Sequence, residues 1–248
     1  MKNRPLLAYF RLFGMAAIIF GHLVPVLIGR ALLGKDVWWA VRRRQMIARD
    51  LMRFLKIKVT TTGAPRVGNF LYISNHRSYI DPVPVADLVP FVPIAKAEVG
   101  RWPLIGWAAR MTGIFYVKRH DKSSRAGTRE AAREVLKTGG AVLVYPEGTT
   151  SAVGTTLPFR PGTFGMAADL GVGVVPIAIE YANASDAWVG ADTFIPHFLR
   201  CFSKPETHVW LHFFPPIFEA DASILLETTQ RLIDEQLLIW QNTKRIGK

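Results

Sequence analysis

The chain has 248 residues, of which 50% are hydrophobic and 20% are charged. This composition excludes an intrinsically disordered protein, and the length allows one large domain or a domain with an appendage. A single cysteine excludes an intramolecular disulfide framework and a cysteine-rich zinc site. The formal net charge of +12 calls for an anionic partner, which is either a nucleic acid or a membrane surface.

The positive charge is concentrated in the first quarter of the chain. Residues 1–58 contain twelve Lys and Arg against two Asp, so this segment carries +10 and the remaining 190 residues carry +2. Within it, the run Leu12–Gly29 has no fixed charge, although Gly21, His22 and Pro25 interrupt a stretch that is already short for a membrane span. Basic residues beside an apolar run favour a membrane surface over nucleic acid, for which no recognition motif is present.

A second basic segment follows the apolar run. Residues 37–57 mix aromatic and aliphatic residues with arginines, which predicts an amphipathic helix that lies in the headgroup plane, packs on the body, or does both. A cleaved signal peptide is disfavoured because Arg11 lies inside the apolar region and no small-residue cleavage site follows. We therefore expect residues 1–58 to anchor the chain by a helical pair with cytoplasmic basic flanks. Residues 59–248 are expected to form the functional domain.

Short apolar runs alternate with helical segments through the body of the chain. This alternation predicts an α/β fold in which helices cover a mixed sheet. The expected strands are residues 70–74, 91–95, 114–117, 141–145, 172–179 and 207–214. The expected helices are residues 102–111, 123–137, 163–170 and 224–240.

The first of these strands is followed by Asn-His-Arg-Ser-Tyr-Ile-Asp, in which His76 and Asp81 are five residues apart. A histidine at the end of a strand lies at the sheet edge where α/β proteins bind ligands. A turn between the two residues would bring the carboxylate to one imidazole nitrogen and leave the other as a base for a hydroxyl proton. No Gly-x-Ser-x-Gly nucleophile motif occurs, so that hydroxyl would belong to a substrate. The alternative is structural, with Asp81 capping a helix and His76 merely hydrogen-bonded.

A second loop of this kind follows the expected strand at 141–145. It reads Tyr-Pro-Glu-Gly-Thr-Thr-Ser over residues 145–151. Gly148 permits close approach of the backbone to a ligand, and the hydroxyl groups can donate hydrogen bonds. Taken alone, the same residues also fit an ordinary glycine-containing turn.

Four ordered motifs resemble those of the glycerolipid acyltransferase family. They are Asn-His-x-x-x-x-Asp at 75–81, Gly-Ile-Phe-Tyr-Val-Lys-Arg at 113–119, Pro-Glu-Gly-Thr at 146–149 and Val-Val-Pro-Ile at 174–177. The bacterial lysophosphatidic acid (1-acylglycerol-3-phosphate) acyltransferases are the most similar group, and Lys96 with Glu98 resembles a basic element of those enzymes. The resemblance extends over residues 60–215, and the N-terminal helix pair is similar to the bacterial membrane anchor.

The resemblance implies an activity. The protein would transfer a fatty acyl group from acyl-ACP or acyl-CoA to the free hydroxyl of lysophosphatidic acid, giving phosphatidic acid, without an acyl-enzyme and without a bound cofactor. His76 would act as general base, and Asp81 would orient it. The implied location is the cytoplasmic side of a bacterial inner membrane, with membrane lipids, the lysolipid and the acyl thioester as partners.

The resemblance also implies the residues that bind substrate. Glu147, Gly148 and Thr149 would shape the acceptor site. The anionic head group would be bound by a cation, for which the candidates are Arg119, Lys96 and Arg160. For Arg119 the alternative is a solvated surface charge.

One position departs from the family pattern. Family members that act on a phosphate acceptor commonly have Arg after Pro-Glu-Gly-Thr, whereas this chain has Thr150. A hydroxyl cannot bind phosphate in the bidentate manner of a guanidinium group. Either one of the three candidate cations binds the phosphate alone, or the acceptor is another lysolipid such as lyso-ornithine lipid. A non-catalytic lipid-binding protein is disfavoured because the histidine and aspartate pair is complete.

The remaining reactive side chains predict no further chemistry. His208 and His212 share a strand face without a carboxylate, which is poor geometry for a metal ion, so we expect no metal site. Cys201 has no adjacent base and is not expected to be a nucleophile.

Overall fold

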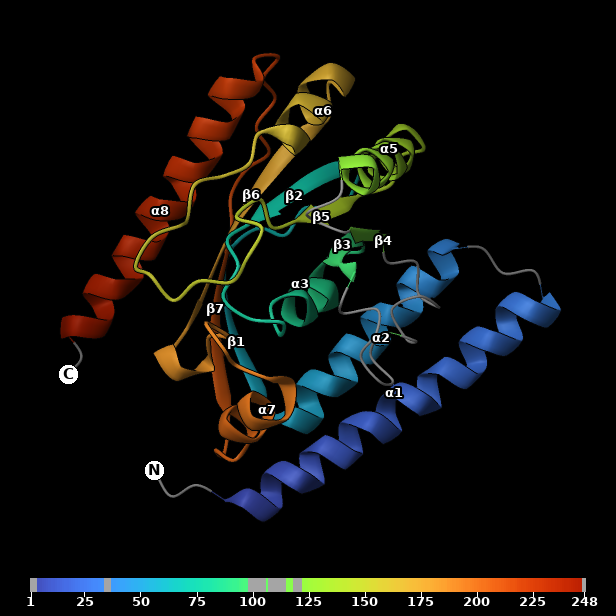
Figure 1. Cartoon of the computed structure of the whole chain (residues 1–248), viewed down its shortest axis with the longest axis vertical. Helices are drawn as coiled ribbons and strands as arrows, with labels where there is room; N and C mark the ends of the chain where they lie inside the picture. Colours follow the sequence, from blue (N-terminus) through green and yellow to red (C-terminus); the bar gives the residue numbers. More distant parts are fainter. Residues whose placement is uncertain (1–3, 34–36, 98–105, 107–114, 118–121, 247–248) are drawn as a thin grey trace.

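The computed structural model describes residues 4–33, 37–97, 106, 115–117 and 122–246 (Figure 1). The strands are β1 (Ile57–Gly63), β2 (Phe70–Ser74), β3 (Val92–Lys96), β4 (Phe115–Val117), β5 (Val142–Val144), β6 (Gly173–Tyr181) and β7 (Thr207–Phe213). In this part of the chain they form a seven-stranded sheet in the order β1-β7-β6-β2-β5-β3-β4. Neighbouring strands are parallel except β6 and β7, which are antiparallel, so the predicted mixed sheet is confirmed.

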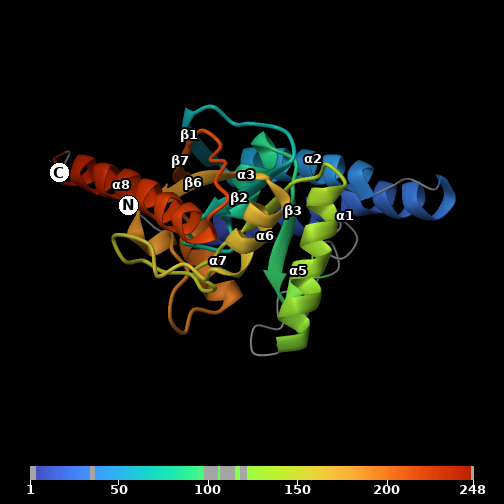
Figure 2. The same ribbon diagram turned by 90° about the horizontal axis from the view of Figure 1, so that it is seen from above.

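Helices cover both faces of the sheet (Figure 1 and Figure 2). One face is covered by α2 (Val37–Leu55), α3 (Pro82–Leu88) and α7 (Phe194–Phe202), and α1 (Pro5–Leu33) packs outside them against α2 and α7. The other face packs against α5 (Lys122–Lys137), α6 (Gly162–Leu170) and α8 (Ala222–Ile246). A short 3₁₀ turn, Ala184–Asp186, lies between β6 and α7.

The central strands are buried on both sides, which explains their continuous apolar sequences. Successive side chains of a strand point to opposite faces of the sheet. In β2, Tyr72 packs into the core beneath α1, α2, α3 and α7, whereas Leu71 and Ile73 pack into the core beneath α5, α6 and α8. A strand covered on both faces therefore shows no alternation of apolar and polar residues.

Two elements differ from the sequence prediction. The pattern assigns Ile57 to the end of a helix, but Ile57 begins β1, and Lys56 makes the turn between them with a φ of 56°. The β-branched run Thr60–Thr62 suits an edge strand, which gains its stability by pairing with β7. The helix α7 falls in a segment where the sequence pattern predicts no element. The helix predicted at 102–111 lies outside the described residues except for Gly106, which is helical.

The N-terminal helices pack on the body of the protein. Met15 and Leu23 of α1 and Leu51 of α2 belong to the same apolar cluster as the sheet residue Tyr72. The two helices also contact each other through polar groups, since Nε2 of His22 lies 2.9 Å from a carboxylate oxygen of Asp50. The amphipathic second helix therefore packs on the body, which is one of the two arrangements that its sequence allows. The division of function between residues 1–58 and 59–248 stays a prediction.

Arg11 holds α1 against α7. Its buried guanidinium group donates to the backbone carbonyl oxygens of Phe202 at 3.0 Å, Lys204 at 2.5 Å and Pro205 at 2.7 Å. Carbonyl groups at the end of a helix lack intrahelical partners, and a cation there also interacts favourably with the helix dipole. The basic residue Arg11 in the apolar N-terminal segment thus supplies hydrogen-bond donors to carbonyl oxygens at and just after the end of α7.

The opposite face of α1 is apolar and exposed. The segment Pro5–Val26 is long and apolar enough to cross a membrane by length and composition, and only 28% of its most apolar window is buried. Leu6 is 84% exposed and Phe13 is 72% exposed on this helix. An exposed apolar face beside basic residues is typical of a helix that enters a lipid leaflet.

We expect the protein to remain in the membrane fraction after a high-salt wash, because salt screens ionic contacts but not apolar ones. The double variant Leu6→Gln with Phe13→Gln should partition onto anionic vesicles at least about tenfold more weakly, since each exposed apolar side chain contributes roughly 2 kcal/mol when buried in lipid. Vesicle co-sedimentation measures this. The control is Val67→Gln, which alters an apolar residue that is 67% exposed outside the N-terminal helices. If the control lost as much vesicle binding as the double variant, or if the double variant lost none, the apolar face of α1 would not be the membrane-binding surface.

Candidate active site

The loop after β2 is held by a side chain that continues the strand pairing. The Asn75 amide nitrogen donates to the Ile179 carbonyl oxygen at 2.9 Å, and its amide oxygen accepts from the Ile179 backbone nitrogen at 2.8 Å. Ser74 is the last residue of β2 and pairs with Ile177 of β6. The asparagine thus extends the contact between the two strands by one further step. As a result, His76 leaves the sheet from a fixed position.

The structure brings His76 and Asp81 together as predicted. Nδ1 of His76 lies 2.8 Å from Oδ2 of Asp81. The same carboxylate oxygen accepts from the backbone nitrogens of Arg77 at 2.7 Å and Ser78 at 2.9 Å, and the other oxygen accepts from the Tyr181 hydroxyl at 2.7 Å. Asp81 precedes α3 but makes no side-chain cap hydrogen bond to it. The alternative reading of Asp81 as a helix cap is therefore wrong.

The imidazole is oriented with one nitrogen free. Because Asp81 is buried and accepts at Nδ1, the neutral ring carries its proton on Nδ1 and leaves Nε2 unprotonated. Nε2 has no hydrogen-bond partner among the described residues, and the side chain is 15% exposed. The ring also stacks on Tyr145, with centroids 4.1 Å apart and planes at 19°. A base at Nε2 is thus both held in place and reachable.

Glu147 joins three loops around the histidine. Its carboxylate accepts from the backbone nitrogen of His76 at 2.7 Å and from that of Leu157 at 2.9 Å. The side chain is buried, and burial raises the pKa of Glu147 above its ordinary value, an effect that the two backbone hydrogen bonds oppose. The Ser151 backbone nitrogen in turn donates to the His76 carbonyl oxygen at 2.9 Å. Glu147 therefore fixes the relative positions of the loops around the site by accepting hydrogen bonds from their backbone amides.

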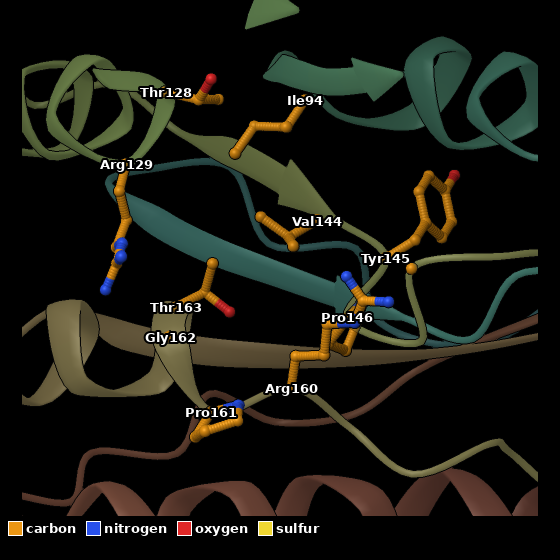
Figure 3. Close-up of a pocket in the computed structure, with 11 residues that line it drawn as sticks. Ile94, Thr128, Arg129, Val144, Tyr145, Pro146, Arg160, Pro161, Gly162 and Thr163 are labelled. Atoms are coloured by element: carbon orange, nitrogen blue, oxygen red, sulfur yellow. The ribbon is translucent and has the colours of Figure 1, made fainter. Parts of the chain in front are cut away.

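Gly148 makes room for Arg160. A methyl group on Gly148 would lie only 2.7 Å from Cζ of Arg160, and the glycine has a φ of 73°, which L side chains rarely adopt. The Arg160 backbone nitrogen donates to the Pro146 carbonyl oxygen at 3.1 Å, which fixes the arginine beside the loop. Figure 3 shows Arg160 next to Pro146 and Tyr145. The structure thus places the predicted cation Arg160 against the predicted loop.

The remaining predicted residues either lie in the loop after β5 or fall, wholly or in their side chains, outside the part of the chain that the structure describes. Thr149 is exposed and Thr150 is half-buried in the loop after Gly148. Lys96 is the last residue of β3, and its side chain is outside the described part, as is the whole of Arg119.

Three site residues are missing from the sequence prediction. Tyr181 at the end of β6 contacts Asp81, and Tyr145, directly after β5, stacks on the His76 ring. No local sequence pattern indicates these contacts. Arg77 is fully buried and donates to the Ser151 carbonyl oxygen at 3.0 Å, with Glu180 at 3.4 Å as its ionic partner. The only feature of the sequence that points to Arg77 as a site residue is its position between His76 and Asp81 in the motif.

The contacts of His208, His212 and Cys201 indicate no catalytic or metal-binding role. His208 and His212 contact the hydroxyl groups of Thr60 and Thr62 at 2.8 Å each. Within the described residues, no group of three or more His, Cys, Asp or Glu side chains could hold a metal ion. Burial raises the pKa of the Cys201 thiol, so this cysteine is a poor nucleophile.

Comparison with known proteins defines the class. The acyltransferase family model matches residues 56–180, which contain both loops of the site, and the chain belongs to this family. It is 30% identical over 230 residues to lyso-ornithine lipid O-acyltransferase of Pseudomonas aeruginosa, covering 87% of this chain and 86% of that protein. The resemblance to glycerolipid acyltransferases is thus confirmed, and the protein is an O-acyltransferase.

Two further similarities concern lysophosphatidic acid enzymes. A chloroplastic 1-acyl-sn-glycerol-3-phosphate acyltransferase of Brassica napus is 31% identical over 168 residues, covering 67% of this chain and 46% of that protein. The crystal structure of the 1-acyl-sn-glycerophosphate acyltransferase PlsC from Thermotoga maritima superposes with a TM-score of 0.59 at 19% identity, covering 93% of this chain and 98% of that chain. This last similarity confirms the fold.

We expect Glu147→Gln to lower the free energy of unfolding by about 2 kcal/mol, because two backbone amides need an acceptor and glutamine supplies one oxygen. The difference also depends on pH. Since the folded-state pKa of Glu147 is raised, folding favours its protonated form, and the wild-type stability should fall as pH rises above the ordinary value of 4.5. Glutamine removes that slope. Denaturant unfolding at several pH values measures both effects.

The matched control for this experiment is Glu227→Gln, which changes an exposed glutamate on α8. It should alter neither the free energy of unfolding nor its pH dependence. A Glu147→Gln protein as stable as the control would show that the carboxylate does not hold the loops together.

Proposed function

We propose that the protein transfers a fatty acyl group from an acyl thioester to the free hydroxyl of lysophosphatidic acid, giving phosphatidic acid. The observation that carries this proposal is the His76–Asp81 pair, with Nε2 of the histidine accessible and unpartnered among the described residues. A base that has no enzyme nucleophile beside it acts on a hydroxyl group supplied by the substrate.

The reaction then needs one transfer step. Nε2 of His76 accepts the proton of the acceptor hydroxyl as its oxygen attacks the thioester carbonyl carbon. The tetrahedral intermediate expels the thiolate, which takes the proton from the imidazolium ring, so the histidine returns to its neutral form. Asp81 stabilises the imidazolium through the 2.8 Å contact with Nδ1. The four donors around Asp81 support this role, because they hydrogen-bond its buried carboxylate and hold it against the ring.

The acceptor would bind beside the loop that contains Gly148 and Thr149. Glu147 would shape this site by bracing the loop, since both of its carboxylate oxygens contact backbone amides. Arg160 would bind the anionic head group, which its guanidinium group can reach because it is exposed at Gly148. Lys96 and Arg119 remain candidates for the same role on the resemblance alone.

A second acceptor is lyso-ornithine lipid. Thr150 stands where phosphate-acceptor enzymes commonly have arginine, and the Pseudomonas aeruginosa relative covers nearly the whole of this chain. The ornithine head group carries a carboxylate and an ammonium group, so it requires less positive charge from the enzyme than a phosphomonoester does.

We also propose a location and a donor. The exposed apolar face of α1 and the +10 charge of residues 1–58 support attachment to the cytoplasmic face of a bacterial inner membrane. Separation of inner and outer membranes on a density gradient tests this location. The donor would be acyl-ACP or acyl-CoA, and no bound cofactor is needed for the transfer.

The variant His76→Ala should lose about 10²–10⁴-fold in kcat, because it removes the general base. The measurement is transfer from acyl-CoA and acyl-ACP by purified protein. The control is His208→Ala, which removes a half-buried histidine that contacts Thr60 on the far edge of the sheet. An undiminished rate in His76→Ala with both donors would overturn the mechanism.

The acceptor is tested by assaying lysophosphatidic acid and lyso-ornithine lipid side by side. We expect turnover of lysophosphatidic acid, and we expect Thr150→Arg to raise kcat/KM for this acceptor relative to the other, because a guanidinium group binds phosphate bidentately. Activity on lyso-ornithine lipid alone would establish the second candidate instead.

A further inference from the structure

A cavity lies beside the catalytic pair. It has a volume of about 440 Å³ and lies between α5 and α6, where β3 and β5 end (Figure 3). Ile94 and Val144 give it an apolar wall. Tyr145 lines it as well, and the same ring stacks on His76. The cavity is therefore separated from the His76 ring by the side chain of Tyr145.

Two arginines line this cavity. Arg129 extends from α5 and Arg160 precedes α6, and both side chains are exposed. Neither has a carboxylate partner in the part of the chain that the structure describes. By contrast, Arg133, one turn further along α5, pairs with Asp169 at 2.8 Å. Two guanidinium groups without a carboxylate partner give the cavity a positive potential that favours an anion.

One hydroxyl group in the cavity has no hydrogen-bond partner in the part of the chain that the structure describes. Thr163 Oγ1 is buried and makes no hydrogen bond within the described residues. A buried polar atom without a partner is rare and costs free energy unless a ligand or water satisfies it. In Figure 3 Thr163 lies between Arg129 and Arg160. It belongs to the first turn of α6, which has no side-chain cap, so free backbone amides add to the positive potential there.

The approach of Arg160 depends on a small residue, because a methyl group on Gly148 would collide with it. A methyl group on Gly162 would lie 3.6 Å from a terminal nitrogen of Arg129, which is an ordinary contact distance. The two guanidinium groups thus lie close to the backbone of the loops that border the cavity.

We propose that Arg129, Arg160 and Thr163 form a phosphate-binding subsite that holds a substrate of the acyl transfer. Two guanidinium groups and a hydroxyl match the charge and the several oxygens of a phosphate group better than those of a single carboxylate. The phosphate belongs either to the acceptor head group or to the phosphopantetheine arm that acyl-ACP and acyl-CoA share. The inference rests on the proposed function, and Arg129 supplies positive charge that Thr150 does not.

The test compares Arg129→Gln with the control Arg133→Gln on the same helix. Loss of a charge-assisted contact should raise one KM at least about tenfold with kcat nearly unchanged, and Arg129→Lys should recover only part of it. A rise in KM for lysophosphatidic acid identifies the acceptor phosphate. A rise in KM for both thioester donors identifies the phosphopantetheine phosphate. Unchanged KM values for acceptor and donors would overturn the proposal while leaving the acyl transfer intact.

A second measurement does not depend on turnover. Glycerol 3-phosphate and inorganic phosphate should raise the Tm of the detergent-solubilised full chain, and Arg129→Gln and Thr163→Val should each diminish the increase, whereas Arg133→Gln should not. If no lysolipid were acylated but this pattern held, the proposed function would fail and the subsite would stand. An equal increase of Tm in wild type and both subsite variants would overturn the subsite.

Discussion

Hydrogen bonds to the buried carboxylate of Asp81 fix the geometry of the site. A carboxylate without water is costly unless donors surround it, and here four donors do so. Two of them are backbone amides of the turn itself, so satisfying the charge also closes the turn between strand and helix. The imidazole is the third donor, and its tautomer and direction follow from the same contact. The Tyr181 hydroxyl then fixes this turn to β6.

Glu147, in the loop after β5, is a second buried carboxylate that accepts hydrogen bonds from backbone amides. Its carboxylate also accepts backbone amides, but those amides belong to His76 and Leu157, which lie on different segments. The effect is to tie the histidine loop to the loop that carries Gly148 and to the segment that leads into α6. Asp81 and Glu147 therefore both fix the positions of loops, but only Asp81 contacts the imidazole of His76. Because Arg160 lies on the segment that leads into α6, the base and this cation are positioned together, whereas Arg129 extends from α5.

The N-terminal helices show how a charge and an apolar surface are combined. Arg11 contacts three carbonyl oxygens around the end of α7, and the helix that carries it presents exposed Leu6 and Phe13 on another face. The docking contact fixes the direction in which the apolar face points. The +10 charge of residues 1–58 lies on the same part of the molecule and suits a surface of anionic lipid. Attachment to the body and attachment to a membrane therefore use different sides of one helix.

The sequence predicts the features that depend on near neighbours: the α/β alternation, the apolar N-terminal run, and the approach of Asp81 to His76 across five residues. Such contacts follow from strand and turn geometry, which a short stretch of residues encodes. Contacts between distant segments depend instead on the fold of the whole chain. Glu147 meets the His76 backbone across 71 residues, Tyr181 meets Asp81 across 100, and Arg11 meets Phe202 across 191. The sequence pattern does not predict the edge strand β1 for the same reason, since pairing with β7 stabilises this strand more than its own sequence does. Residue type shows what each of these side chains can donate or accept, and the fold of the whole chain selects the partner.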